Sequence, residues 1–217
     1  MSNIRIEVVE SEPFAENSYI VWAEGQSQAL VVDPGFEPDL IREVLSRNQL
    51  ELTAILNTHG HVDHIAGNRA LKAAAPEAPI IIGHGDAAML TDAMLNMSGK
   101  YGFEVTSPPA DRLVADGDKI TFAGLTLEVR EIPGHSPGHV VFIVKDTDPL
   151  LVLGGDVLFN GSVGRTDFPG GSFEQLAKGI REKLWPLPDT TKVFPGHGPP
   201  TTVGAEKRTN PYVGQSS

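Results

Sequence analysis

The first half of the chain alternates short apolar runs with turn-forming residues. The runs that we expect to form strands cover residues 4–9, 19–22, 30–32, 53–56 and 80–82. After the third run, apolar residues recur at helical spacing from Leu40 to Leu45, and Pro38 suits the first turn of a helix. We expect a second, shorter helix over 67–75, because Pro76 cannot continue it. The pattern is therefore strands first, followed by strands that alternate with helices.

The second half repeats this scheme. Its expected strands cover residues 119–122, 125–129, 140–144 and 150–153. Ser172 followed by Gln175 has the form of a capping box, so a helix begins there, and Pro186 ends it. We interpret the irregular stretch 87–110 as a helix that packs on the core followed by a loop, in preference to a lid over a substrate. The pattern by itself indicates a mixed α/β protein.

Length and composition set the limits of this interpretation. The chain has 217 residues, 40% of them hydrophobic, and no linker or short repeat, so we expect one domain over residues 1–217. It has no cysteine, which excludes disulfides and zinc–thiolate sites and fits a reducing cytoplasm. The N-terminus does not look like a signal peptide, and no apolar run reaches the roughly 20 residues that span a bilayer. We therefore expect a cytoplasmic protein without a membrane partner.

The charge of the chain argues against one class of partner. The formal net charge is −11, and no run of Lys or Arg occurs. Because phosphate backbones are bound by clustered cations, nucleic acid is not an expected substrate. We interpret the net negative charge as a general surface property that keeps the protein in solution.

The densest chemistry lies within residues 57–67. His59, His61, Asp63 and His64 put four potential metal ligands directly after an expected strand. In an extended segment, residues two apart project the same way, so His59 and His61 can bind one ion. Asp63 and His64 then face elsewhere and suit a second ion. Two neighbouring ions form the arrangement that converts a bridging water to hydroxide near neutral pH.

Three further ligand-type residues follow short apolar runs later in the chain. They are His135, Asp156 and His197, and each directly follows a glycine. A glycine lets the backbone turn sharply and approach an ion where a Cβ would obstruct it. One such histidine would be read as a surface turn residue, but three positions beside the first cluster indicate a shared metal centre.

The chain has the motif His-x-His-x-Asp-His followed by a Gly-His, a Gly-Asp and a final Gly-His. This order of motifs resembles that of the metallo-β-lactamase superfamily. The resemblance covers nearly the whole chain and implies a four-layer αββα sandwich with the ligands along one edge of two sheets. It places His59, His61 and His135 on the first metal. It places Asp63, His64 and His197 on the second metal and makes Asp156 the bridge. Two divalent ions per chain are implied, with zinc as the first expectation and iron or manganese also admissible.

Within that superfamily, the chain looks most like the short bacterial members of the glyoxalase II group. The sequence Pro-Gly-His-Ser-Pro-Gly-His over 133–139 and Gly-Gly-Asp-Val-Leu-Phe over 154–159 carry this closer match. The resemblance implies hydrolysis of S-lactoylglutathione or a related S-acylglutathione by a hydroxide that bridges the ions. Asp156 would hold that geometry, and Asp63 is a candidate for handling the proton. A true β-lactamase is less expected, because those enzymes commonly place Cys where Asp156 stands.

The thiol carrier is supported by one residue. Full-length members of this group have a C-terminal helical domain that supplies much of the glutathione site, and we expect this chain to lack it, as residues end soon after His197. Where those enzymes have a tyrosine after the last Gly-His, this chain has Pro199. Arg165 matches a lysine position that binds the glutathione carboxylate. The alternative for Arg165 is a surface arginine paired with Asp167.

A second activity uses the same residue types. A persulfide dioxygenase of this superfamily oxidises glutathione persulfide with one Fe(II), which His59, His135 and Asp156 would hold as a facial triad. Residues 164–168 resemble a stretch of these dioxygenases, but the last Gly-His motif does not, so we favour the hydrolase.

Three other polar residues lie near the expected ligands in the sequence. We interpret His84 as no ligand and His139 as structural. Asp33 either orients a ligand histidine or caps a turn.

Overall fold

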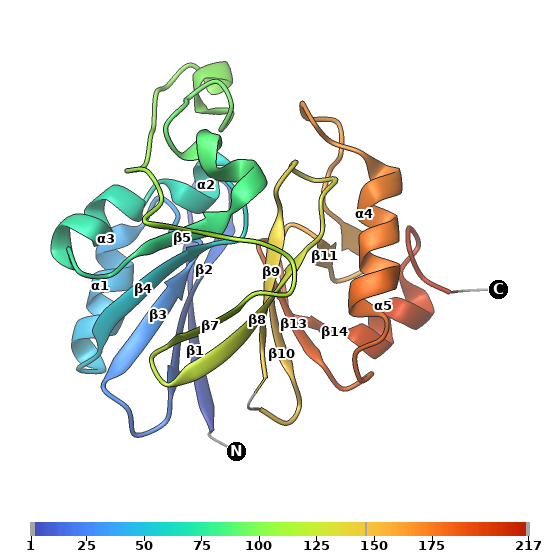
Figure 1. Cartoon of the computed structure of the whole chain (residues 1–217), viewed down its shortest axis with the longest axis horizontal. Coiled ribbons are helices and arrows are strands. Elements are labelled where there is room, and N and C mark those ends of the chain that lie inside the picture. Colours follow the sequence, from blue (N-terminus) through green and yellow to red (C-terminus); the bar gives the residue numbers. More distant parts are fainter. Residues whose placement is uncertain (1–2, 146, 216–217) are drawn as a thin grey trace.

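The first sheet is built from the N-terminal half of the chain. The computed structural model describes residues 3–145 and 147–215. The six strands run in the order β1-β2-β3-β4-β5-β6, antiparallel up to β3 and parallel beyond it (Figure 1). Their bounds are β1 Ile4–Ser11, β2 Glu16–Ala23, β3 Gln28–Val32, β4 Glu51–Asn57, β5 Ile80–Gly83 and β6 Arg112–Val114.

The second sheet has the order β14-β13-β10-β9-β8-β7 and is antiparallel except where β10 lies beside β13. Its strands are β7 Lys119–Phe122, β8 Leu125–Glu131, β9 Val140–Val144, β10 Leu151–Gly155, β13 Lys192–Pro195 and β14 Thr201–Thr202. A small hairpin, β11 Leu158–Phe159 with β12 Ser162–Val163, follows β10.

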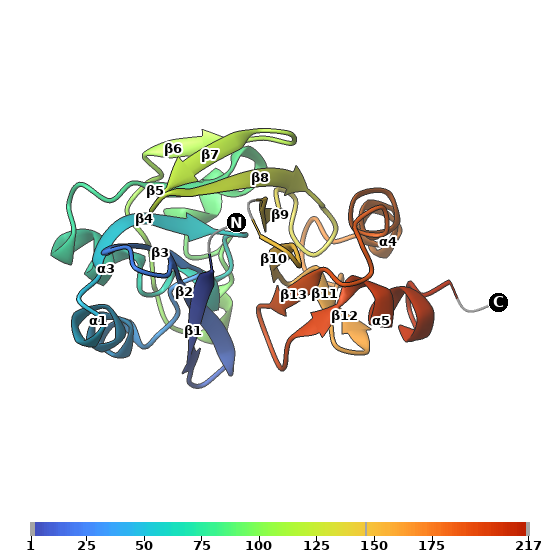
Figure 2. The same cartoon turned by 90° about the horizontal axis from the view of Figure 1, so that it is seen from below.

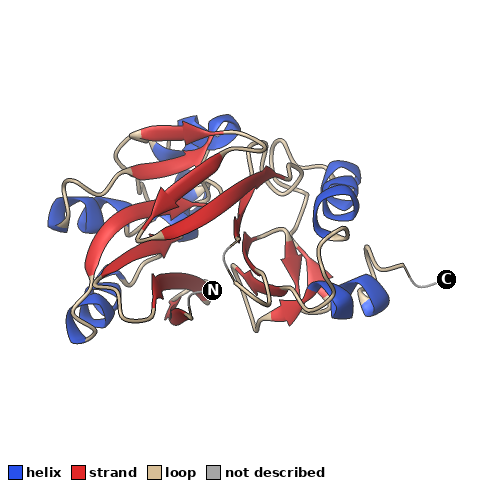
Figure 3. Ribbon diagram, turned by 60° about the horizontal axis from the view of Figure 1, so that its bottom comes forward, coloured by secondary structure: helices blue, strands red, loops and turns tan. Residues whose placement is uncertain are grey.

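Helices cover the outer face of each sheet, which produces four layers (Figures 2 and 3). The first sheet carries α1 Pro38–Arg47, α2 Val62–Ile65 and α3 Asn68–Ala74, and the 3₁₀ turns η1 His84–Leu90 and η2 Ser98–Tyr101 follow β5. The second sheet carries α4 Phe173–Gly179, which continues as the π-helical η3 Ile180–Leu184, and α5 Val203–Thr209. No helix in the described ranges is long and apolar enough to cross a membrane.

Three hydrophobic layers hold this arrangement together. Phe142, Leu56 and Leu153 belong to the cluster between the two sheets, and two further clusters lie between each sheet and its helices. Strand β9 is buried along its whole length and is apolar throughout, whereas β2 is equally buried but begins with the polar residues Glu16, Asn17 and Ser18. The αββα sandwich and the mixed α/β class are therefore confirmed.

Local expectations from the sequence mostly hold. The N–H of Gln175 donates to Ser172 Oγ at 3.3 Å, which is the N-cap half of the expected capping box, while the N–H of Ser172 donates to the Gly134 carbonyl at 2.8 Å. Leu40 is exposed although it belongs to the apolar stripe of α1, because only Ile41, Val44 and Leu45 face the sheet.

The interpretation of 87–110 as a core-packed helix is only partly right. Met89 is buried, but the helical turns are short 3₁₀ segments, and Met97 and Tyr101 line a cavity.

Candidate metal centre

Four loops from both sheets meet at one edge of the sandwich. The loop after β4 carries the first cluster, the β8–β9 loop carries His135, and the ends of β10 and β13 carry Asp156 and His197. Gly196 is required by this crowding, since a Cβ there would run into the Asp156 carboxylate and the His64 ring. Six of the seven histidines gather here, and exposed His84 stands apart, as expected.

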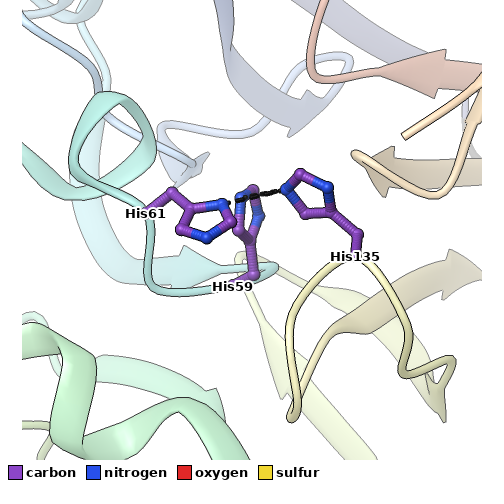
Figure 4. Close-up of side chains that lie close together, drawn as sticks. All are labelled: His59, His61 and His135. Atoms are coloured by element: carbon purple, nitrogen blue, oxygen red, sulfur yellow. Dashed lines mark hydrogen bonds between the residues drawn. The ribbon is translucent and has the colours of Figure 1, made fainter. Parts of the chain in front are cut away.

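The rings of His59, His61 and His135 face one another (Figure 4). His135 Nε2 lies 2.9 Å from His61 Nδ1 and 3.2 Å from His59 Nε2, and all three side chains are buried. Three imidazole nitrogens that converge within 4.8 Å form a group that could hold an ion. The structure thus brings together the set expected for the first metal.

A second group lies beside the first. Asp63 Oδ2 is 3.4 Å from His197 Nε2 and 3.7 Å from His64 Nε2. His64 Nε2 is buried and has no hydrogen-bond partner among the described residues. Because a buried polar nitrogen without a partner is costly, a ligand for it is expected. A divalent ion fits this mixed nitrogen and oxygen donor set.

The Asp156 carboxylate lies between the two groups. Its Oδ2 is 3.4 Å from His135 Nε2 and 3.6 Å from His197 Nε2, while its Oδ1 is 3.5 Å from His64 Nε2. Oδ1 is buried and also lacks a hydrogen-bond partner within the described ranges. One carboxylate therefore faces both groups with donor atoms, which is the position expected of a bridge.

Asp33 organises the histidines from behind. It accepts hydrogen bonds from the Thr58 N–H at 2.7 Å and from Thr58 Oγ1 at 2.6 Å, and its Oδ2 lies 3.1 Å from His64 Nδ1. Thr58 Oγ1, whose proton is used by Asp33, lies 3.1 Å from His59 Nδ1 and accepts from it. Both rings thus keep the proton on Nδ1 and turn the Nε2 lone pair toward the centre. Of the two interpretations of Asp33, the geometry supports the one in which it orients a ligand.

Backbone carbonyls fix two of the remaining three rings, those of His135 and His197. His135 Nδ1 lies 2.8 Å from the Arg165 carbonyl, and His197 Nδ1 lies 3.1 Å from the Phe14 carbonyl. A carbonyl only accepts, so each Nδ1 carries the proton and each Nε2 is free to act as a ligand.

Two supporting residues connect the ligand loops. His139 Nε2 accepts a hydrogen bond from the Asp156 N–H at 3.0 Å, which agrees with the structural role expected for His139. Asp86, which the sequence did not single out, accepts from the Gly60 N–H at 3.1 Å, Ser136 Oγ at 2.6 Å and the Gly138 N–H at 2.6 Å. It therefore ties the loop of His59 and His61 to the loop of His135. The sequence offered one signal for Asp86, which follows strand β5 closely, as the candidate ligands follow their strands.

The charges of the two groups differ. Burial, followed by the neighbouring histidines, lowers the pKa of His59 well below its usual value, so its ring is neutral. Burial also lowers the pKa of His64, but Asp63 and Asp156 outweigh it and raise that pKa. Burial raises the pKa of Asp63, yet His64 and His197 outweigh it and lower that pKa. The second group thus contains a carboxylate that stays ionised, Asp63, whereas the first group consists of imidazole rings alone.

Arg165 lies at the rim of the centre. Its Nε and Nη2 each donate to Asp167 at 2.7 Å, and its guanidinium stacks 3.9 Å from the centre of the Phe168 ring. The pairing with Asp167 that we considered as an alternative is present. Arg165 also lines the cavity above the centre, so a second partner from the substrate can reach it.

The centre opens into a cavity of about 350 Å³. Its floor consists of His61, Asp63, His135, Asp156 and His197. Its walls include the apolar side chains Phe14, Met97, Tyr101, Phe159, Val163 and Phe168. A reactive polar floor beneath apolar walls is the usual form of a small-molecule site.

Comparison with known sequences agrees with this geometry. The model of the metallo-beta-lactamase superfamily matches residues 11–197. A probable metallo-hydrolase of Bacillus subtilis, YqgX, is 41% identical over 93% of both chains. The hydroxyacylglutathione hydrolase GloC of Haemophilus influenzae is 33% identical over 99% of this chain and 100% of its own.

Solved structures also share the fold. BLEG-1, a B3 metallo-beta-lactamase, superposes with a TM-score of 0.91 at 34% identity over 96% of this chain and 99% of its own. TTHA1623 in a di-iron-bound form superposes with a TM-score of 0.83 at 36% identity, over 95% of this chain and 99% of its own. ETHE1 from Myxococcus xanthus superposes with a TM-score of 0.80 at 27% identity, over 98% of this chain and 86% of its own.

Proposed function

The chain belongs to the metallo-β-lactamase superfamily, and from this membership we propose that it is a binuclear thioester hydrolase acting on S-lactoylglutathione or a related S-acylglutathione. The observation that carries the proposal is Asp156, whose two oxygens face the two separate ligand groups. Two groups with a shared carboxylate between them support two ions per chain.

The metal ligands that we propose are the seven residues expected from the sequence. His59, His61 and His135 hold one ion, Asp63, His64 and His197 hold the other, and Asp156 serves both. The unpartnered His64 Nε2 and Asp156 Oδ1 support this assignment. Zinc is our first choice, and the di-iron form of TTHA1623 supports iron as an alternative.

Two divalent ions held by these residues would supply a water of lowered pKa and would polarise the substrate carbonyl. The protein residues set the conditions for that chemistry. Asp156 fixes the position of the two ligand groups relative to each other. Asp63 is partly accessible beside His197, and we propose that it is the base that takes the proton of the water. A thiolate leaves without protonation, so no separate general acid is required.

The glutathione carrier rests on two supports. GloC, a hydroxyacylglutathione hydrolase, aligns with nearly the whole chain. Arg165 at the rim offers a guanidinium to a substrate carboxylate. We propose that residues 1–217 perform the reaction as one domain.

Two other activities have specific support. His59, His135 and Asp156 lie close enough to form the facial triad of a persulfide dioxygenase, since His135 Nε2 is 3.2 Å from His59 Nε2 and 3.4 Å from Asp156 Oδ2. The similarity to BLEG-1 supports a β-lactam as a substrate. Neither alternative accounts for both the bridge and the GloC similarity.

One set of assays tests the proposal. Metal-loaded protein is given S-lactoylglutathione, a chromogenic cephalosporin and glutathione persulfide, with thioester loss, β-lactam opening and oxygen uptake as readouts. We expect thioester hydrolysis to dominate, to be lost on chelation and to return with added metal. Oxygen uptake or β-lactam opening at a higher kcat/KM than thioester hydrolysis would contradict the proposal.

A further inference from the structure

Four aromatic rings form a continuous cluster beside the metal centre, which we call the aromatic wall. It consists of Phe14, Phe36, Tyr101 and Phe103. The ring centres of Phe14 and Tyr101 are 5.7 Å apart, and Phe36 lies 5.8 Å from Phe14 and 6.1 Å from Phe103. These spacings are those of mutually packed aromatic side chains.

The wall is assembled from three separate segments. Phe14 comes from the β1–β2 turn, Phe36 from the β3–α1 connection, and Tyr101 and Phe103 from η2 and the loop that follows. Phe14 and Tyr101 line the cavity. The Tyr101 side remains open, because Tyr101 is 50% exposed and Phe103 36%. Apolar rings left open at the mouth of a reactive cavity indicate a surface that a ligand covers.

Phe14 of the wall and the rim cation Arg165 lie beside different ligand groups. The Phe14 carbonyl accepts from His197, which belongs to the second group. Arg165 contacts His135 through its carbonyl, and Phe168 packs 5.3 Å from His61, so both lie at the first group. A thioester placed over Asp156 would therefore direct one of its two sides to the cation and the other to the aromatic rings.

Charge indicates which part of the thioester, the thiol carrier or the acyl group, lies beside Arg165. Among the described residues that line the cavity, Arg165 is the only lysine or arginine, and it already has Asp167 as a partner. A carboxylate-bearing thiol carrier therefore belongs on the Arg165 side, and the acyl group belongs on the aromatic side.

We infer that the aromatic wall is an acyl-group subsite that selects thioesters whose acyl group carries an aromatic ring. This inference rests on the proposed thioester hydrolase. The 97–103 segment thus has a role in specificity, which the sequence pattern left open. A phenyl group placed against Phe14 and Tyr101 is removed from water and packs on two rings, whereas a methyl group at the same place buries much less area.

The test compares S-lactoylglutathione with S-mandeloylglutathione. The two share the thiol and the α-hydroxy acid and differ only in methyl against phenyl. For the unmodified protein, we expect kcat/KM to favour the phenyl substrate by about 10-fold. In Tyr101→Ala this ratio should fall to near unity, and in Tyr101→Phe it should be kept, because the ring and not the hydroxyl makes the contact.

Tyr212→Ala is the matched control. Tyr212 is 54% exposed and does not line the cavity, so both rates and their ratio should stay unchanged. Equal kcat/KM for the two substrates in the unmodified protein, or an unchanged ratio in Tyr101→Ala, would overturn the inference while leaving the hydrolase in place. Hydrolysis of neither substrate would overturn the proposed function and the inference with it.

Discussion

Asp33 and His64 form a buried pair that defines the second ligand group, with Asp33 Oδ2 3.1 Å from His64 Nδ1. Neither residue is exposed, and the same carboxylate also binds the N–H and hydroxyl of Thr58. One aspartate behind the centre therefore sets the tautomer of His64 and, through Thr58, that of His59.

Replacing Asp33 with Ala should weaken metal binding without removing a ligand. We expect affinity to fall about 10- to 100-fold, because an unsupported imidazole loses its orientation and part of its basicity. Calorimetric titration of the metal-free protein measures this. Asp39→Ala is the control, since the Asp39 side chain is 84% exposed and pairs with Arg42 on the surface. Equal affinities for the two variants would refute the role given to Asp33.

Asp86→Ala should affect both stability and the first ligand group. Three buried donors lose their acceptor, so we expect the free energy of unfolding to fall by about 3 kcal/mol. Urea denaturation of the metal-free protein gives this value, and metal titration gives the second effect.

The control for Asp86 is Asp92→Ala. Asp92 also accepts backbone N–H groups, those of Met94 and Leu95, but on the surface. Its replacement should cost less than about 1 kcal/mol and leave metal affinity unchanged. If Asp86→Ala destabilises the chain but binds both ions normally, Asp86 supports the fold alone.

Arg165→Ala should raise KM for a glutathione thioester by about 10-fold with little change in kcat. This is toward the low end for a charged hydrogen bond, because Arg165 must share its donors with Asp167. A contact remote from the thioester carbon is made equally in ground and transition states. A short neutral thioester should be insensitive to the change. Equal loss on both thioesters would show that Arg165 only supports His135 or the local fold.

The candidate ligands could be found in the sequence because four of them are clustered and the other three share one local signal. His59, His61, Asp63 and His64 lie within a stretch of six residues, and the other three follow glycines after strands. Strand ends of neighbouring strands meet at one edge, so convergence follows from the fold. The longer strands were found from apolar runs, whereas the prediction did not include β6, β11, β12, β13 and β14, each of which has four residues or fewer.

The supporting residues could not be predicted in the same way. Asp86 is one aspartate among many in the sequence, and its three donors come from two loops that only the folded chain brings together. The aromatic wall has the same origin, since Phe14 and Tyr101 are far apart in sequence and touch only across the cavity mouth. Tautomers likewise depend on partners such as Thr58, which tertiary structure supplies.

Asp156→Ala tests the bridge directly. Loss of the carboxylate that faces both groups should lower thioester hydrolysis by several orders of magnitude, and the loss should appear in kcat more than in KM. Steady-state kinetics on S-lactoylglutathione measure it, with circular dichroism to verify folding. Near-normal turnover would exclude the proposed role of Asp156.

The central claim, a binuclear hydrolase, is tested most directly by activity measured against metal content. Metal-free protein is loaded stepwise, and each sample is analysed for ions per chain and for thioester hydrolysis. We predict that hydrolysis reaches its maximum only at two ions per chain, and that His64→Ala loses the second ion and most of the activity. Full activity at one ion per chain, with His64→Ala as active as the unmodified protein, would contradict the account.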